Sequence, residues 1–102
     1  GNGFMEINKV YGTLDGSWIK WYAEGKKEED GEYKNGMKIG TWSRYNMTGI
    51  VVEDWNYDNK GRNLCEITYY SNGTVKRYCD YFSKTIQEYN MDGSMKGEKV
   101  PF

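Results

Sequence analysis

The residues best suited to chemistry are acidic and lie in one short run. Glu28-Glu29-Asp30, followed by Glu32, is the densest group of carboxylates in the chain. Paired carboxylates can bind a cation or act as acid and base. In an extended strand, alternate side chains point to opposite faces, which places Glu28 and Asp30 on one face and Glu29 on the other. We therefore interpret the run as a solvated charged strand, and an enzyme built on it is the least favoured hypothesis.

The sequence contains no other arrangement of residues that is typical of a catalytic or cofactor-binding site. There is no His, the commonest general base and metal ligand. Ser and Thr hydroxyls therefore lack a His to activate them, and no glycine-rich phosphate loop precedes a helix. Two Cys residues without His or a nearby carboxylate cluster do not make a zinc site. We expect no catalytic residue, no metal and no cofactor, and we predict that the protein is not an enzyme.

Charge and composition narrow the class of partner. The chain has 14 Lys and Arg against 15 Asp and Glu, for a net charge of −1. Because neither sign is concentrated, a nucleic-acid-binding or anionic-membrane surface is not expected. No apolar run approaches the length of a bilayer span, so we expect no membrane span. The apolar content is mostly rings, with 10 Tyr, 4 Trp and 3 Phe, which suits a thin sheet.

Two tryptophans could bind a ligand directly. Trp18 and Trp42 occupy corresponding positions on an otherwise polar face, where an exposed ring can stack on a sugar or anchor a partner. The alternative is that each packs against the neighbouring repeat unit. The candidate binding residues are Trp18, Trp42, Trp21, Tyr45, Trp55, Tyr57 and Tyr69.

Evenly spaced glycines predict the elements that position these residues. Gly25, Gly49, Gly73 and Gly93 each follow a polar residue and precede a strand-like run, at spacings of 24, 24 and 20 residues. A fixed period in this range is typical of a repeat array. Each glycine fits a three-residue hairpin loop, a type I turn closed by a left-handed glycine. We predict an all-β fold, an elongated antiparallel meander of tandem hairpins in a single twisted sheet.

The same spacing defines the domain organisation. Residues 1–102 form one repeat domain. Its parts are a half repeat over 1–15, repeats over about 16–39, 40–63, 64–83 and 84–97, and a C-terminal tail over 98–102. Degenerate ends are expected where a repeat has no neighbour on which to stack.

The loops also predict which residues share a face. Around Gly73, residues whose numbers sum to 144 should pair, with equivalent sums at the other tips. One face then collects Trp21, Tyr45, Tyr69, Tyr89, Val51, Val75, Met95, Lys27, Ile19, Ile67, Trp55, Tyr33, Tyr57, Tyr81, Cys65 and Cys79. The other face collects Lys20, Glu28, Asp30, Arg44, Asp54, Thr68, Lys76, Asp80, Glu88 and Lys96, with Trp18, Trp42, Val52 and Tyr78 as apolar exceptions. An uncovered aromatic face of this size should be closed by curling, by self-association or by a partner.

The predicted register sets Cys65 directly opposite Cys79. A cross-strand disulfide can form at such a site and would indicate an oxidising compartment, so an exported, periplasmic or cell-surface location is favoured over the cytoplasm. The alternative is two reduced, buried thiols. Because the chain begins at Gly1 rather than at Met, we expect a trimmed or replaced N-terminus, from which a signal peptide could have been lost.

One stretch of the sequence resembles a known repeat. It reads Trp18-x-x-Trp21-Tyr22-x-x-Gly25-Lys-Lys-Glu-Glu-x-Gly31-x-Tyr33-x-x-Gly36-x-x-x-Gly40-x-Trp42. This pattern is similar to the bacterial variant of the MORN repeat, and weaker copies extend it over about residues 11–93. They retain Tyr45, Gly49, Tyr57, Tyr69, Tyr70, Gly73, Tyr81, Tyr89 and Gly93. The resemblance implies an extended antiparallel sheet used for protein interaction or scaffolding, and some bacterial members carry an antitoxin label.

Two other repeats show a weaker, local similarity. The segment Tyr57-Asp58-x-x-Gly61-Arg62-x-Leu64 with Thr68 and Gly73 is similar to the YD repeat of secreted toxin shells. The segment Asn35-Gly36-Met37 to Trp42 is similar to cell-wall-binding aromatic repeats. The sequence thus leaves two functional hypotheses. The first is a protein-binding or scaffolding module, which binds a protein partner or a second copy of itself. The alternative is a carbohydrate or cell-wall binder that uses exposed Trp and Tyr.

Overall fold

The structure is a computed structural model. It describes the backbone of residues 5–10 and 13–102 and the side chains from residue 14 onward. Within the described residues, all regular structure is β-strand. The strands are β1 (Met5–Val10), β2 (Thr13–Trp21), β3 (Lys27–Lys34), β4 (Met37–Tyr45), β5 (Val51–Tyr57), β6 (Asn63–Tyr69), β7 (Val75–Asp80), β8 (Thr85–Glu88) and β9 (Val100–Pro101).

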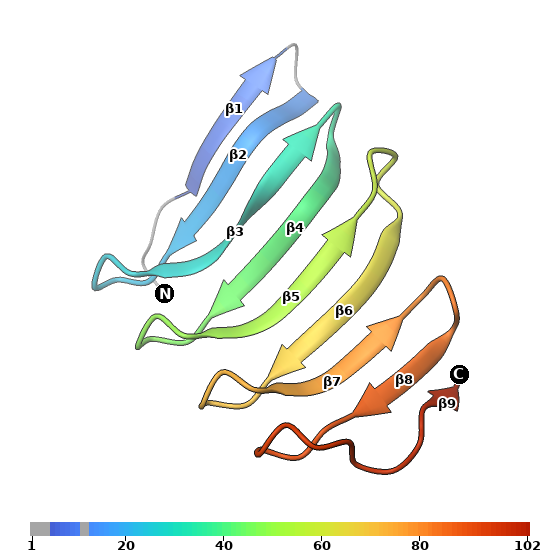
Figure 1. Cartoon of the computed structure of the whole chain (residues 1–102). Coiled ribbons are helices and arrows are strands. Elements are labelled where there is room, and N and C mark those ends of the chain that lie inside the picture. Colours follow the sequence, from blue (N-terminus) through green and yellow to red (C-terminus); the bar gives the residue numbers. More distant parts are fainter. Residues whose placement is uncertain (1–4, 11–12) are drawn as a thin grey trace.

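The strands form one antiparallel sheet in which spatial order equals chain order. Figure 1 shows that the loops after β2, β4, β6 and β8 lie along one edge of the sheet, and the turns after β3, β5 and β7 along the opposite edge. The chain measures 48 × 33 × 14 Å along its principal axes. The smallest extent, 14 Å, is that of a single layer. The predicted all-β meander is confirmed.

The four tip loops have the predicted glycine conformation. Gly25, Gly49, Gly73 and Gly93 have φ angles of 90°, 89°, 87° and 91°, in the left-handed region. The amide of Gly49 donates to the carbonyl of Asn46 at 3.0 Å, which closes the turn. The pairs next to the tips are also as predicted: Trp21 with Lys27, Tyr45 with Val51, Tyr69 with Val75, and Tyr89 with Met95.

Beyond each of the first three tips, the predicted register is wrong by one residue. Lys20 pairs with Glu29, Arg44 with Glu53, and Thr68 with Arg77. The extra residue is Glu28 in β3, Val52 in β5 and Lys76 in β7, so the same position is bulged in each repeat. A bulge increases the local twist of the strand and moves every later side chain to the other face.

The bulges correct the predicted faces. Paired residues share a face and neighbours along a strand alternate, so pairing defines two sets of side chains. The Tyr45 face carries Ile19, Trp21, Lys27, Asp30, Ser43, Tyr45, Val51, Asp54, Cys65, Ile67, Tyr69, Val75, Tyr78, Asp80 and Gln87. The Trp42 face carries Trp18, Lys20, Glu29, Gly31, Tyr33, Trp42, Arg44, Glu53, Trp55, Tyr57, Glu66, Thr68, Arg77 and Cys79. Two groups thus lie opposite to their predicted face: Tyr33, Trp55, Tyr57 and Cys79 lie on the Trp42 face, and Asp30, Asp54, Tyr78 and Asp80 lie on the Tyr45 face.

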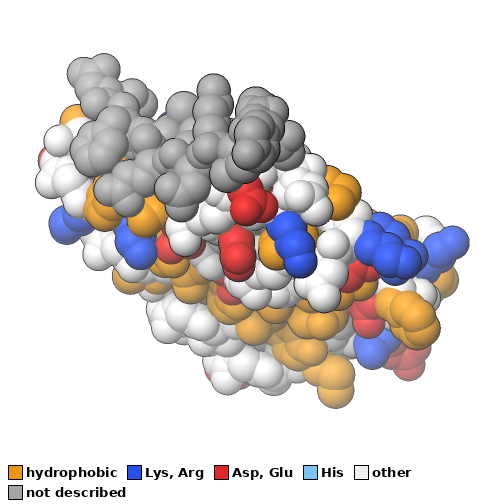
Figure 2. Space-filling model, turned by 90° about the horizontal axis from the view of Figure 1, so that it is seen from above, with side chains coloured by type: hydrophobic (Ala, Val, Ile, Leu, Met, Phe, Trp, Pro, Cys, Tyr) orange, Lys and Arg blue, Asp and Glu red, His pale blue; other side chains and the backbone are white. Residues whose placement is uncertain are grey.

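The sheet buries few of its side chains. Among the described residues, those that are buried are Ile39, Trp42, Cys65, Cys79 and Gln87. A single layer has no second sheet or helix to cover either face, so most apolar side chains stay partly exposed. Figure 2 shows apolar side chains gathered along one side of the molecule, while Lys, Arg, Asp and Glu are interspersed elsewhere on the view.

The C-terminal segment covers the last edge of the sheet, although the sequence predicts only a degenerate tail there. Residues 97–102 return along β8, where Ile86 pairs with Val100 and Thr85 with Pro101. The side-chain amide of Gln87, 4% exposed, donates to the carbonyl of Gly97 at 3.2 Å. Because Pro101 has no amide hydrogen, the short β9 is a poor template for another strand.

Candidate functional site

The Trp42 face has a cluster of stacked rings at its N-terminal half. The ring of Trp42 lies 5.2 Å from that of Trp18 and 5.0 Å from that of Tyr33, centroid to centroid, the second in an edge-to-face arrangement. The Nζ atom of Lys38 lies 4.5 Å from the Trp42 ring centroid. The indole N–H donates to the carbonyl of Glu32 at 3.1 Å, so its one polar group is satisfied.

Gly31 creates the space for this cluster. It lies on β3 between β2 and β4, opposite Trp18, and the indole of Trp42 lies directly over it. A Cβ atom at this position would lie 2.0 Å from Cδ2 of Trp42. The contact, rather than a special backbone angle, therefore requires glycine at position 31.

The cluster decides between the two hypotheses for Trp42. Trp42 is 1% exposed, so its ring cannot serve as a stacking platform for a sugar. Trp18 is half-buried and one side of it faces Trp42. The exposed-platform hypothesis is wrong for Trp42, because the missing Cβ of Gly31 lets the ring sink onto the sheet.

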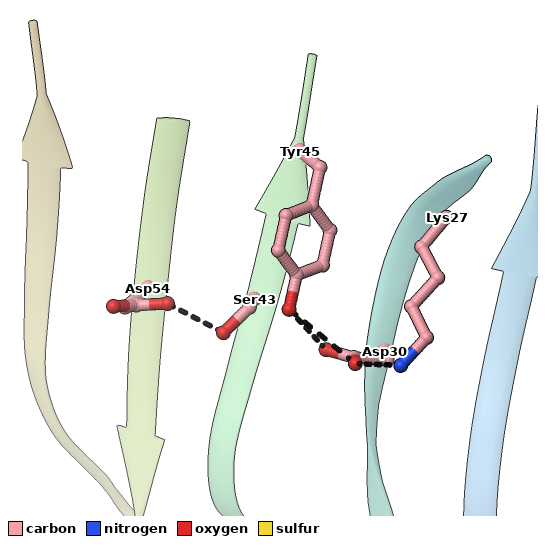
Figure 3. A network of polar contacts seen from close by, with 5 residues as sticks. All are labelled: Lys27, Asp30, Ser43, Tyr45 and Asp54. Atoms are coloured by element: carbon pink, nitrogen blue, oxygen red, sulfur yellow. Dashed lines mark hydrogen bonds and ion pairs between the residues drawn. The ribbon is translucent and has the colours of Figure 1, made fainter. Parts of the chain in front are cut away.

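The Tyr45 face carries a hydrogen-bonded ladder between repeats. The hydroxyl of Tyr45 donates to both carboxylate oxygens of Asp30, at 3.2 and 3.4 Å, and Nζ of Lys27 lies 3.3 Å from the same carboxylate (Figure 3). One repeat later, the hydroxyl of Tyr69 donates to Asp54 at 2.8 Å, and Ser43 donates to Asp54 at 2.6 Å. Each contact joins a tyrosine to the carboxylate 15 residues earlier, which links successive hairpins.

The ladder keeps its tyrosines protonated. Burial raises the pKa of Tyr45, and the charge of Asp30 raises it further. Burial and the hydrogen bond to Asp54 raise the pKa of Tyr69 to about 12. The hydroxyls therefore act as hydrogen-bond donors at neutral pH rather than as bases.

A second set of bonds joins the tips. The hydroxyl of Tyr22 donates to the carbonyl of Tyr45, and that of Tyr70 to the carbonyl of Tyr89, both at 2.7 Å. These tyrosines directly follow the paired residues at the tips, so the first tip is fixed to the second and the third tip to the fourth. The tip edge is thus linked in two pairs of tips.

The predicted binding residues do not form one surface. Trp21, Tyr45 and Tyr69 lie on the Tyr45 face, whereas Trp18, Trp42, Trp55 and Tyr57 lie on the other. The residues near the tips form a row on the Tyr45 face, in which Lys27 of β3 stands between Trp21 and Tyr45. We name the apolar and aromatic members of this row the tip band. Its members, all partly or fully exposed, are Trp21, Tyr45, Val51, Tyr69, Val75, Tyr89 and Met95.

The two cysteines do not face each other. Cys65 pairs with Asp80, and Cys79 pairs with Glu66, so the predicted direct pair is wrong because of the bulge at Lys76. Both are buried and free, and Cys65 Sγ accepts a hydrogen bond from the Asn56 amide at 3.1 Å. Neighbouring positions along the register place the two thiols on opposite faces of the sheet.

The acidic run is divided by the bulge at Glu28. Glu28 forms an ion pair with Lys20 at 3.0 Å. Glu29 lies opposite Arg44 in the register of β3 and β4, and Asp30 belongs to the tyrosine ladder. The prediction that Glu28 and Asp30 share a face is therefore wrong. Nowhere in the described part of the chain do three or more His, Cys, Asp or Glu side chains gather closely enough to hold a metal ion.

The sequence did not indicate one feature at the turn edge. Phe82 is 91% exposed on the turn between β7 and β8, beside a hollow of about 480 Å³ that Leu64 and Tyr81 also line. Asp80 accepts hydrogen bonds from the amides of Phe82 and Ser83, which fixes this turn. One signal in the sequence could have indicated it: the turn after β7 has no glycine, whereas the turns after β3 and β5 contain Gly36 and Gly61.

Comparison with known proteins gives a fold likeness only. No family model and no curated protein matches the sequence. Among solved structures, the chain is similar to part of a TarM mutant from S. aureus in complex with fondaparinux, alpha-GlcNAc-glycerol and UDP. The TM-score is 0.54 and the identity 14%, over 85% of this chain and 21% of that chain. A second TarM structure matches with a TM-score of 0.45 and 16% identity. The chain thus spans about one fifth of TarM. Across the described residues there is also no helix long and apolar enough to cross a membrane.

Proposed function

We propose that this chain is a non-enzymatic repeat module that presents its sheet to another protein, in the manner of the MORN-like repeats it resembles. The observation that carries the proposal is the open single layer. The sheet is 14 Å thick, and the tip band lies half-buried along its Tyr45 face, with Met95 exposed. An exposed apolar band on a rigid support is typical of a protein-binding surface.

The chemistry of the two faces supports the Tyr45 face as the contact surface. On the Trp42 face, the ring of Trp42 is already covered. The ion pairs of Lys20 with Glu28 and of Arg44 with Glu53 would have to lose water there. On the Tyr45 face, Asp30 and Asp54 already accept hydrogen bonds from tyrosines. The Tyr45 face carries one ion pair of its own, Lys27 with Asp30, against these two on the Trp42 face, so covering the Tyr45 face desolvates fewer charged pairs.

Carbohydrate binding is the competing function and is weaker on this geometry. Fondaparinux, which is present in the TarM complex, agrees with a carbohydrate ligand. The similarity to TarM, however, is confined to the fold and to about one fifth of TarM. The covered ring of Trp42 removes one of the two predicted platforms.

A pair of charge variants tests the proposal. Val75→Glu places a charge in the tip band, and Thr68→Glu adds the same charge on the opposite face, beside Arg77. Immobilised wild-type protein and both variants are exposed to extract from the source cell, and a candidate partner is then purified and titrated. We expect a partner whose affinity falls at least about tenfold with Val75→Glu but is unchanged with Thr68→Glu.

The control titrates glycans against intrinsic Trp fluorescence. Two results together would favour carbohydrate binding over protein binding as the function. The Trp fluorescence would shift saturably with a glycan, and no protein would bind the two charge variants with different affinity.

A further inference from the structure

The exposed surface of this chain is larger than its mass predicts. A compact monomer of 11.9 kDa is expected to expose about 5,950 Å². The chain exposes 6794 Å². The excess is roughly 850 Å², close to the ~800 Å² that one partner contributes to a standard protein interface. One face of a sheet with extents of 48 and 33 Å has room for a contact of that size.

The tip band has a regular alternation of large and small side chains. Tyr45 on β4 is followed by Val51 on β5, then by Tyr69 on β6, Val75 on β7 and Tyr89 after β8. Adjacent strands lie about 4.8 Å apart, so a ring and a small side chain alternate at that spacing. Such a surface is ridged, and a flat partner would leave voids above the valines.

A second copy of the same band fills those voids. If a two-fold axis runs along the strands between β5 and β6, β5 of one copy lies over β6 of the other and β4 lies over β7. Tyr69 then faces Val51 of the second copy, and Tyr45 faces Val75 of the second copy. Every central tyrosine meets a valine, and the isologous contact forms twice by symmetry. Stacked sheets pack about 10 Å apart, which leaves room for one ring between the layers.

We propose that the protein self-associates as a face-to-face dimer through the tip band, so that the two single layers form one two-layer sandwich. The inference rests on the proposed function, since it names a second copy as the protein that covers the Tyr45 face. The hydroxyls of Tyr45 and Tyr69 need no new partner in the dimer, because Asp30 and Asp54 accept them within the chain. The area excess and the alternation of side-chain size support the same occupant.

Sedimentation equilibrium of the purified chain, from about 1 to 200 μM, tests the inference. We expect twice the chain mass at the upper concentrations. Val51→Glu should weaken the dimer at least about tenfold, whereas Thr68→Glu on the opposite face should leave it unchanged. Circular dichroism of each variant verifies that it is folded.

Cross-linking keeps the test decisive if Val51→Glu does not fold. Val51→Cys is a mild change close to the proposed axis, and a short bis-maleimide should link two copies through it but not through Thr68→Cys. A folded wild-type chain that stays monomeric throughout, or equal cross-linking of the two cysteine variants, overturns the dimer. If the chain is monomeric but Val75→Glu still weakens its binding to a purified partner protein, the dimer is wrong and the proposed function stands. Failure of the dimer and failure of the proposed function are therefore distinguishable.

Discussion

The two halves of the sheet have the same backbone unit but are stabilised differently. In the half from β2 to β5, rings fill the Trp42 face, with Trp42 packed over Gly31. In the half from β6 to β8, the positions 24 residues after Trp42 and Trp55 hold Glu66 and Cys79. There the returning C-terminal segment covers the edge instead, through Gln87 and β9. The tip loops specify the hairpin, and each half then supplies its own packing.

The largest effect is expected from Trp42→Ala. The ring is fully buried in a single-layer protein with few other buried groups, so its loss should cost about 3 to 5 kcal/mol of unfolding free energy. Urea unfolding followed by circular dichroism measures this. Trp55→Ala, its cross-strand neighbour, is the control and should cost less because that side chain is only half-buried. Equal costs would contradict the special role of Trp42.

Gly31→Ala should cost about 1 to 3 kcal/mol, because the new methyl group overlaps the Trp42 ring. The clash depends on that ring, so the double variant Gly31→Ala with Trp42→Ala should be strongly non-additive. The same denaturant series measures all three proteins. Strict additivity would show that glycine is needed at position 31 for a reason other than the ring.

Gln87→Ala acts on the other half of the sheet. Its amide donates to the carbonyls of Glu88 and Gly97, at 2.9 and 3.2 Å, so its removal should cost about 1 to 2 kcal/mol. The damage should be local, with faster hydrogen exchange in β8 and β9 and unchanged exchange in β3 and β4. Uniformly faster exchange would argue against two separately stabilised halves.

Tyr69→Phe should have the smallest effect, about 1 kcal/mol at neutral pH, through loss of the hydrogen bond to Asp54. Because the folded-state pKa of Tyr69 is raised to about 12, above its usual value of 10.0, the folded chain holds this proton more tightly than the unfolded chain. Its contribution to stability is therefore complete below pH 10 and is lost as the pH rises toward 12.

A spectrophotometric titration checks the pH dependence. Tyr69→Phe should remove one of the late-titrating tyrosines, and the loss of stability between pH 10 and 12 should become shallower. Tyr81, whose burial also raises its pKa to about 12, remains as an internal reference in the C-terminal half. An unchanged late titration in Tyr69→Phe would contradict the assignment.

The sequence predicts the fold well because glycine spacing is a local signal. A left-handed glycine closes each tip, and the first pair beside it follows directly from loop length, as for Tyr69 with Val75. The bulges at Glu28, Val52 and Lys76 could not be predicted, since a bulged residue has no distinctive side chain. Each bulge inverts the faces beyond it, which is why the pair of Cys65 with Cys79 and the single aromatic face were wrong.

The candidate site was predictable only in part. The aromatic row headed by Trp21 was placed correctly, because it lies between the tip and the bulge. The position of Trp42 over Gly31 was not, because it depends on a contact across two strands rather than on alternation within one. Trp18 and Trp42 occupy corresponding positions in their repeats, so the sequence did not predict that Trp42 is buried and Trp18 only half-buried.

Hydrogen exchange measured strand by strand on the wild-type chain tests most directly whether the two halves are stabilised separately. We predict the slowest exchange in β3 and β4, around Gly31 and Trp42, and intermediate protection in β7 and β8 that falls selectively in Gln87→Ala. In Trp42→Ala, β3 and β4 should no longer show the slowest exchange, while the protection of β8 should be unchanged. Loss of protection to the same degree in every strand, in both variants, would mean that the sheet unfolds as one unit and would contradict this division.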